Sequence, residues 1–187
     1  MTGPLDLETR TGLPAHLRVL ADKYPRAGWQ GHPGFNELTA FWLERHLMFR
    51  KLLDKLVDDA RRHLDAPRPR HGAELSRYTG LLLEQLHGHH MIEDHQYFPR
   101  FRGMDARLVR AFDIMDADHH ALDRHMHDLA EGTNAVLRAM QAGGHAHDGV
   151  GRLLEVQTRF RGFLDRHLAD EEEVIVPIVL EYGDEMA

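Results

Sequence analysis

Two stretches of the chain combine a histidine and a carboxylate at the spacing of one helical turn. Residues 89–99 read HHMIEDHQYFP and residues 167–177 read HLADEEEVIVP. In each stretch a histidine precedes a glutamate by four positions, an acid follows that glutamate, and a proline stands ten positions after the histidine. On a helix, residues i and i+4 lie on one face, so each copy presents an imidazole beside a carboxylate. The repeat predicts a metal site, with two metal ions.

Two further histidines lie on helical faces that are mostly apolar. His46 shares its face with Trp42 and Phe49, and His119 has apolar neighbours at the same helical spacings. His120 instead shares its face with acids, so we expect His119 to point inward. Burying four imidazoles and two carboxylates without a cation is costly, and these faces offer no matching inward lysine or arginine. A bound cation is therefore the better interpretation.

The pairing on the second repeat-bearing helix has two possible registers. His89 stands ten residues before a proline, as His167 does, so the repeat favours His89 with Glu93. The alternative register pairs His90 with Asp94.

The acids that follow the two glutamates also have two interpretations. Asp94 and Glu172 either hydrogen-bond metal-binding imidazoles from behind or are ordinary acids on a helix surface.

Composition limits the classes of protein to which the chain can belong. Its net charge is −7, with 30 acids against 23 bases, which argues against nucleic acid or an anionic membrane as partner. It has 16 histidines and no cysteine, which excludes disulfides, iron–sulfur clusters and thiolate zinc sites. No segment has the roughly 20 apolar residues that span a bilayer, and the N-terminus lacks a signal-peptide pattern. We expect a cytoplasmic protein.

Helical periodicity and breakers predict the elements that position these residues. Residues 1–36 hold four of the eight prolines and predict an irregular arm with one short helix near 15–23. Four long helices are expected at about 36–64, 73–98, 105–142 and 151–180, the second stopped at Pro99 and the fourth kinked or ended at Pro177. We predict an all-α fold, an antiparallel up-down four-helix bundle over residues 37–183. Metal sites in such bundles lie in the core, between facing helices.

The ordered set of candidate ligands is His46, then His89 with Glu93, then His119, then His167 with Glu171. This pattern, over about residues 37–180, resembles the hemerythrin family, specifically its bacterial hemerythrin-like (HHE cation-binding) domains. The resemblance implies a non-haem di-iron centre with an oxo or hydroxo bridge, in which Glu93 and Glu171 bridge the irons. It assigns His46 and His89 mainly to one iron, and His119 and His167 to the other. Zinc or manganese would tolerate the same ligands.

One position departs from the family pattern. Oxygen-carrying hemerythrins have a fifth histidine one turn after the third-helix ligand, and Asp123 stands there in this chain. Asp123 is a candidate seventh ligand, a hydrogen-bond acceptor for a metal-binding imidazole, or a solvated residue. A carboxylate ligand favours the ferric state, so the resemblance predicts a centre that reacts with its ligand rather than a simple reversible store.

Three functions follow from this resemblance. The first is a protein that binds or senses oxygen or nitric oxide. The second is a peroxidase-like or nitric oxide-consuming enzyme in stress defence, and the third is an iron donor or iron sensor. Protein partners are not indicated by the sequence.

Overall fold

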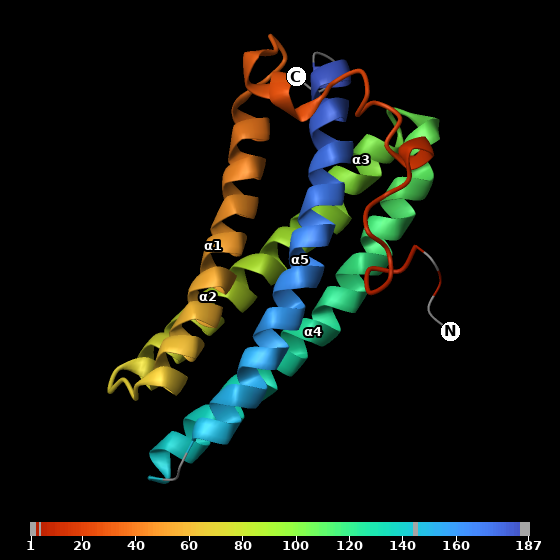
Figure 1. The fold of residues 1–187 in the computed structure, drawn as a ribbon. Helices are drawn as coiled ribbons and strands as arrows, with labels where there is room; N and C mark the ends of the chain where they lie inside the picture. Colours follow the sequence, from red (N-terminus) through yellow and green to blue (C-terminus); the bar gives the residue numbers. More distant parts are fainter. Residues whose placement is uncertain (1–2, 4, 144–145, 184–187) are drawn as a thin grey trace. The chain divides into compact units, whose positions relative to one another are not determined.

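Four long helices pack antiparallel in the computed structural model, which confirms the predicted all-α class (Figure 1). The structure describes residues 3, 5–143 and 146–183, so the predicted arm begins partly outside the described residues. The long helices are α1 (Glu37–Asp65), α2 (His71–Ile92), α4 (Val109–Gln141) and α5 (His147–Tyr182). The short elements are the 3-10 helices η1 (Ala15–Leu17), η2 (Arg26–Gly31) and η4 (Ala106–Leu108), the π-helix η3 (Glu93–Tyr97), and α3 (Phe98–Arg102).

Local chemistry explains where α1 begins and which face it buries. The side chain of Asn36 accepts a hydrogen bond from the backbone N–H of Thr39 at 3.1 Å, which caps the first turn. Along the helix, Trp42, His46 and Phe49 recur every three or four residues and are all buried. The apolar face of α1 therefore carries His46 inward, as its neighbours in the sequence predict.

Contacts divide the chain into two compact units. Unit 1 comprises Met1–Leu47, His90–His120 and Asp165–Ala187, and unit 2 comprises Met48–His89 and Ala121–Leu164. Unit 1 therefore contains the arm, the start of α1, the end of α2, α3, the start of α4 and the end of α5. Its core includes Trp42 and Phe112 from the helices and three leucines of the arm.

The second predicted helix does not end at Pro99. It changes at Glu93 into the one-turn π-helix η3 and then continues as α3. Pro99 lies in the first turn of α3, where a missing N–H costs no helical hydrogen bond. A π-turn inserts an extra residue and rotates the side chains that follow, and this one begins at a candidate ligand.

Pro177 lies inside α5, which continues to Tyr182. Every residue from 174 to 180 is buried, so this turn is surrounded by packing on all sides. Tertiary burial here outweighs the lost helical hydrogen bond, so of the two outcomes expected at Pro177, a kink or an end, the end is wrong.

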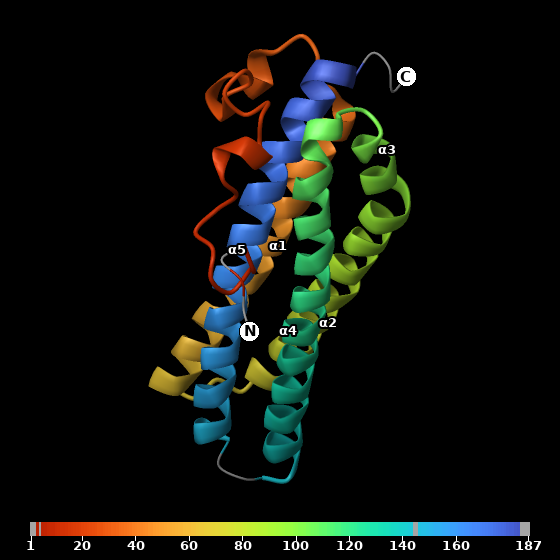
Figure 2. The ribbon, with the colours of Figure 1, turned by 90° about the vertical axis from the view of Figure 1, so that its right-hand side faces the viewer.

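The N-terminal arm runs alongside the C-terminal part of α5 (Figure 2). The predicted helix near 15–23 is only the three-residue η1. Leu13, Leu17 and Leu20 are buried in the core of unit 1, and Trp29 packs on Val176. The arm is therefore part of the folded core of unit 1.

Candidate metal centre

Three buried imidazoles meet in unit 1, one each from α2, α4 and α5. The rings of His90 and His119 are stacked, with centroids 4.0 Å apart. The ring of His167 meets them edge-on, 5.6 Å from His90 and 4.9 Å from His119. Each ring offers a nitrogen within 4.8 Å of the others. We call these residues the three-histidine group.

A fourth imidazole and two carboxylates lie beside this group. His46, Glu93 and Glu171 offer ligand atoms within 4.8 Å of one another, and none is more than 1% exposed. Oε1 of Glu171 lies 3.7 Å from Nε2 of His46, and its Oε2 lies 3.4 Å from Nε2 of His167. Oε2 of Glu93 lies 3.5 Å from Nε2 of His119. Glu171 thus stands between His46 and the three-histidine group, the position that a bridging carboxylate needs.

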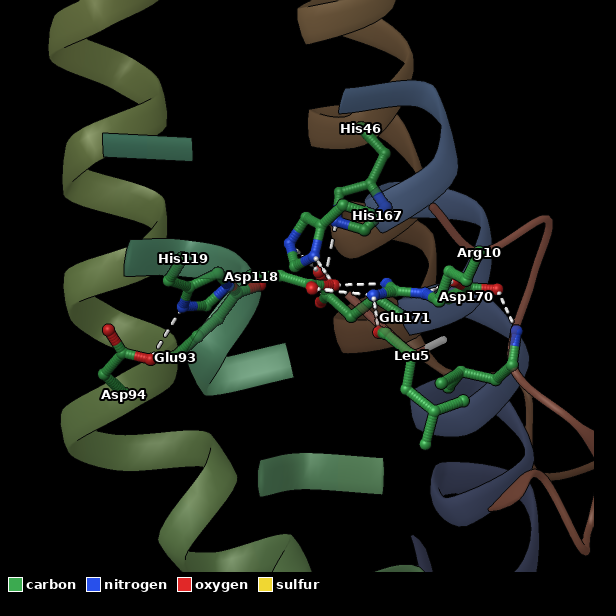
Figure 3. Close-up of polar contacts among 11 residues, drawn as sticks. Leu5, Arg10, His46, Glu93, Asp94, Asp118, His119, His167, Asp170 and Glu171 are labelled. Atoms are coloured by element: carbon green, nitrogen blue, oxygen red, sulfur yellow. Dashed lines mark hydrogen bonds and ion pairs between the residues drawn. The ribbon is translucent and has the colours of Figure 1, made fainter. Parts of the chain in front are cut away.

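Three imidazoles bind a carboxylate through the ring nitrogen that faces away from Glu93 and Glu171. The pairs are His46 Nδ1 with Glu172 at 2.9 Å, His119 Nδ1 with Asp94 at 2.7 Å, and His167 Nδ1 with Asp118 at 3.3 Å. Figure 3 shows the residues of the last two pairs. An ionised carboxylate only accepts hydrogen bonds, so Nδ1 of each ring donates. In the neutral ring this leaves the lone pair on Nε2. Proteins orient metal-binding histidines in this way.

Glu171 also receives a hydrogen bond from a rigid donor. Nε1 of Trp42 donates to Oε1 of Glu171 at 2.7 Å, and both side chains are buried. The Trp42 indole packs edge-on against the ring of Tyr97, with centroids 4.9 Å apart. Packing of the indole therefore fixes one oxygen of this carboxylate.

Without a cation, the site holds protons. Burial acts to lower the pKa of His167, but the hydrogen bond to Asp118 and the nearby charge of Glu171 outweigh it and raise that pKa to about 9. Burial, with the neighbouring charges of Glu171 and Asp94, raises the pKa of Glu93 well above its ordinary value. A cation would replace these protons, because metal ligands bind in their deprotonated form.

The residues present fit a cation of borderline hardness. Nε2 of His119 and Nε2 of His167 are buried, and neither has a hydrogen-bond partner among the described residues. Imidazole nitrogens with carboxylate oxygens suit iron, manganese or zinc. Buried nitrogens of this kind normally have a partner, and a cation would supply one.

Unit 1 brings together five of the seven predicted ligands: His46, Glu93, His119, His167 and Glu171. The choice of His119 over His120 is confirmed, because His119 is 2% exposed and His120 lies on the exposed face. Asp94 and Glu172 do bind imidazoles from behind, as one of their two interpretations predicts.

The other two predicted ligands, His89 and Asp123, belong to unit 2. His89 is the last residue of the first segment of unit 2, where its ring lies 5.2 Å from that of Phe49. On the continuous helix it still precedes Glu93 by one turn. Asp123 also belongs to unit 2 and is exposed on α4, so neither group described above contains it.

The predicted ligand set contains neither His90, which appears only in the alternative register, nor Asp118. A usable signal for His90 existed, since the spacing HHxxE places two imidazoles three and four residues before one glutamate. Asp118 has no such signal, because its partner His167 is 49 residues away in the chain.

Comparison with family models finds a match to the hemerythrin HHE cation-binding domain over residues 37–179. The chain belongs to this family. The matched segment contains every candidate ligand of the hemerythrin-like centre and leaves the N-terminal arm outside. No curated protein and no solved structure matches the chain. None of the described helices combines the length and apolar character that crossing a membrane requires.

Proposed function

We propose that this hemerythrin-like chain is a non-haem di-iron protein that binds or senses oxygen or nitric oxide. The observation that carries the proposal is the three-histidine group beside two buried carboxylates. With His46 and His89, it makes a set of five imidazoles and two carboxylates. In this proposal His90 would be the fifth imidazole, in place of the histidine that oxygen-carrying hemerythrins have at the position of Asp123.

The ligands divide between two ions by their neighbours. His90, His119 and His167 would hold one ion, since their nitrogens already lie together. His46 would hold the other, with His89 as its proposed partner from the preceding turn of α2. Glu93 and Glu171 would be shared, because Glu171 directs one oxygen towards His46 and the other towards His167. This assignment keeps the carboxylate-bridged pattern that the family resemblance implies.

The protein's own contribution is orientation and burial. Asp94, Asp118 and Glu172 hold the rings so that Nε2 faces the centre, and Trp42 holds Glu171. The described ligands are buried, which limits access of bulk water. When bound, a pair of irons supplies a redox-active centre to which a small diatomic molecule can bind.

Elemental analysis and optical spectra test this proposal. We expect two irons per chain after anaerobic loading, and near-ultraviolet bands that appear in air and return to baseline on deoxygenation. Glu171→Gln should lower the iron content, whereas Glu173→Gln, a neighbouring half-exposed acid on α5, should leave it unchanged. An iron content near zero, or spectra that respond to neither oxygen nor nitric oxide, would overturn the proposal.

The same preparation separates the other two functions. Continuous consumption of peroxide or nitric oxide, abolished in His167→Ala, would instead identify an enzyme. Rapid loss of iron to a chelator of physiological strength would indicate an iron donor or sensor.

A further inference from the structure

Arg10, in the arm outside the family match, makes a buried contact with a carboxylate behind the centre. Its guanidinium forms a forked ion pair with Asp118, and its Nε donates to Asp170 at 2.8 Å. Asp118 in turn accepts from Nδ1 of His167. The side chain of Arg10 is 1% exposed, so this chain of contacts is shielded from solvent (Figure 3).

Arg26 makes the corresponding contact on the other side of the centre. Its guanidinium donates to Oε2 of Glu172 at 2.6 Å, and Oε1 of Glu172 accepts from Nδ1 of His46. Arg26 itself lies over the ring of Trp29, with 4.5 Å from the guanidinium carbon to the ring centroid. Trp29 is buried against α5. The arm therefore holds Arg26 in place through packing as well as charge.

The two contacts follow one rule. In each, an arm arginine binds a buried carboxylate whose other hydrogen bond orients an imidazole proposed as a metal ligand. The third carboxylate, Asp94 behind His119, lies on the helix next to Glu93 and is more exposed than the other two. No described arm residue has an ion pair with Asp94 among the contacts of this structure.

We propose that Arg10 and Arg26 are positioning residues of the metal centre, so that the N-terminal arm sets the strength of one histidine ligand on each ion. This inference rests on the proposed function for its metal chemistry. The arm is then a working part of the centre, although it lies outside the segment that defines the family.

The physical reason is that a buried carboxylate needs compensation. Asp118 and Glu172 are each 3% exposed at the side chain. Removing the cationic partner of a buried pair leaves an uncompensated charge, and the carboxylate then turns towards water. This movement weakens its hydrogen bond to the imidazole, which weakens that ligand without removing it.

The geometry of the arm favours this role for Arg10. Gly12 adopts a φ of 154°, which residues with a side chain rarely do. Directly after it, the backbone N–H of Leu13 donates to Oδ1 of Asp170 at 2.9 Å. Asp170 thus binds the arm through both a side chain and the backbone, which fixes Arg10 against Asp118.

The test uses the full chain with Zn²⁺, a diamagnetic ion that these ligands accept. Affinity for two ions is measured by competition with a chromophoric chelator, and ring-nitrogen spectra of His46 and His167 report each site. Loss of a residue behind a metal-bound histidine costs about 10–100-fold in affinity. Arg26 is one hydrogen bond further from the metal than Glu172, so its loss should have an effect at the lower end of this range. We expect Arg26→Gln to weaken the binding of one ion about tenfold. The His46 signals should change and those of His167 should not.

Arg18→Gln is the matched control. Arg18 also lies in the arm and pairs with α5, through Glu173 at 2.8 Å, and no described contact links Glu173 to a candidate ligand. It should leave both ions unchanged, and Arg26→Lys should partly restore what Arg26→Gln loses. Equal effects of Arg26→Gln and Arg18→Gln, or equal weakening of both ions, would overturn the proposal.

Arg10 is tested by a conservative variant, because an uncompensated buried pair threatens folding. Arg10→Lys keeps the charge but cannot fork between Asp118 and Asp170. We expect it to alter the His167 signals and weaken the other ion, with His46 retained. An effect on His46 alone would contradict the assignment.

Ring-nitrogen spectra of the apoprotein test this inference separately from the proposed function. If the wild type binds no metal, the proposed function fails, yet the His46 ring still reports the arm. Arg26→Gln should then alter the Nδ1 signal of His46, because Glu172, which binds that nitrogen, has lost its arginine partner. An unchanged Nδ1 signal in the apoprotein would overturn the role of the arm on its own.

Discussion

The indole N–H of Trp42 donates a 2.7 Å hydrogen bond to Oε1 of Glu171, the carboxylate that lies between His46 and His167. Trp42 stands one turn before His46 on α1. One helical turn therefore supplies both a proposed ligand and the donor that orients a shared ligand. Helical spacing places Trp42 and His46 on one face of α1, and antiparallel packing places that face against Glu171 on α5.

Replacing Trp42 by phenylalanine tests that donor while keeping an aromatic ring. The loss of one hydrogen bond to a buried carboxylate costs about 1–3 kcal/mol. We expect Trp42→Phe to lower the free energy of unfolding of the apoprotein by that amount and to weaken metal binding about tenfold. Urea unfolding and chelator competition measure the two effects. Tyr24→Phe, which removes a donor to Glu181 on the same helix, should leave metal binding unchanged.

The assignment of His90 predicts a site-specific loss. His90→Leu keeps an apolar group of similar volume in the three-histidine group and removes one donor nitrogen. We expect at least about tenfold weaker binding of one ion, with the second ion retained, measured by zinc titration. His87→Ala, an exposed position three residues earlier, serves as control. If His90→Leu binds both ions with full affinity, His90 is not a ligand and α2 contributes only His89.

Glu93 should limit the stability of the apoprotein. Its carboxyl is buried beside Glu171, and burial with the neighbouring charges raises its pKa well above the ordinary value. A neutral amide avoids that cost, so Glu93→Gln should stabilise the apoprotein by about 1–2 kcal/mol while abolishing stabilisation by added zinc. Urea unfolding with and without zinc measures both effects. Exposed Glu84→Gln should change neither, and a less stable Glu93→Gln apoprotein would contradict the argument.

His71 in unit 2 predicts a pH dependence unrelated to metal. Burial, with the nearby His63 and Arg68, lowers the pKa of His71 to about 4. Its ring stacks on His63 with centroids 4.1 Å apart. Since the unfolded chain binds this proton more tightly, the contribution to stability is fully present above pH 6.5. It falls as the pH is lowered towards 4, by about 3 kcal/mol.

His71→Leu should remove that dependence. The difference in free energy of unfolding between wild type and variant is measured by urea titration from pH 7.5 to pH 4, values chosen to bracket the ordinary and lowered pKa. Exposed His16→Gln should follow the wild type throughout. If the free energy of unfolding of the wild type varies with pH in parallel with that of His71→Leu, the prediction for His71 is wrong.

Much of the centre was accessible from local spacing. The pairing of a histidine with a glutamate four residues later, the inward direction of His46 and His119, and the acids after each glutamate depend only on helical geometry. These features hold wherever the helix packs, because the backbone period sets them. The all-α class followed from the same periodicity.

The remaining features depended on contacts between distant segments. Pro177 stays inside α5 because residues on every side of that turn are buried. His90 faces His119 because the end of α2 packs against α4 in unit 1. The residues within one turn of Pro177 do not encode the first outcome, and the HHxxE spacing offers both His89 and His90 without choosing between them.

By itself, the sequence determined the four helices, the two HxxxE pairs and the nitrogen-and-oxygen character of the centre, since all three follow from residue types at helical spacing. Only the tertiary structure decided that His90 joins the group, that Asp123 remains exposed, and that arm arginines bind the carboxylates behind His46 and His167. The reason is that hydrogen bonds between residues more than a hundred positions apart, such as Arg10 with Asp118, leave no periodic trace in a single chain.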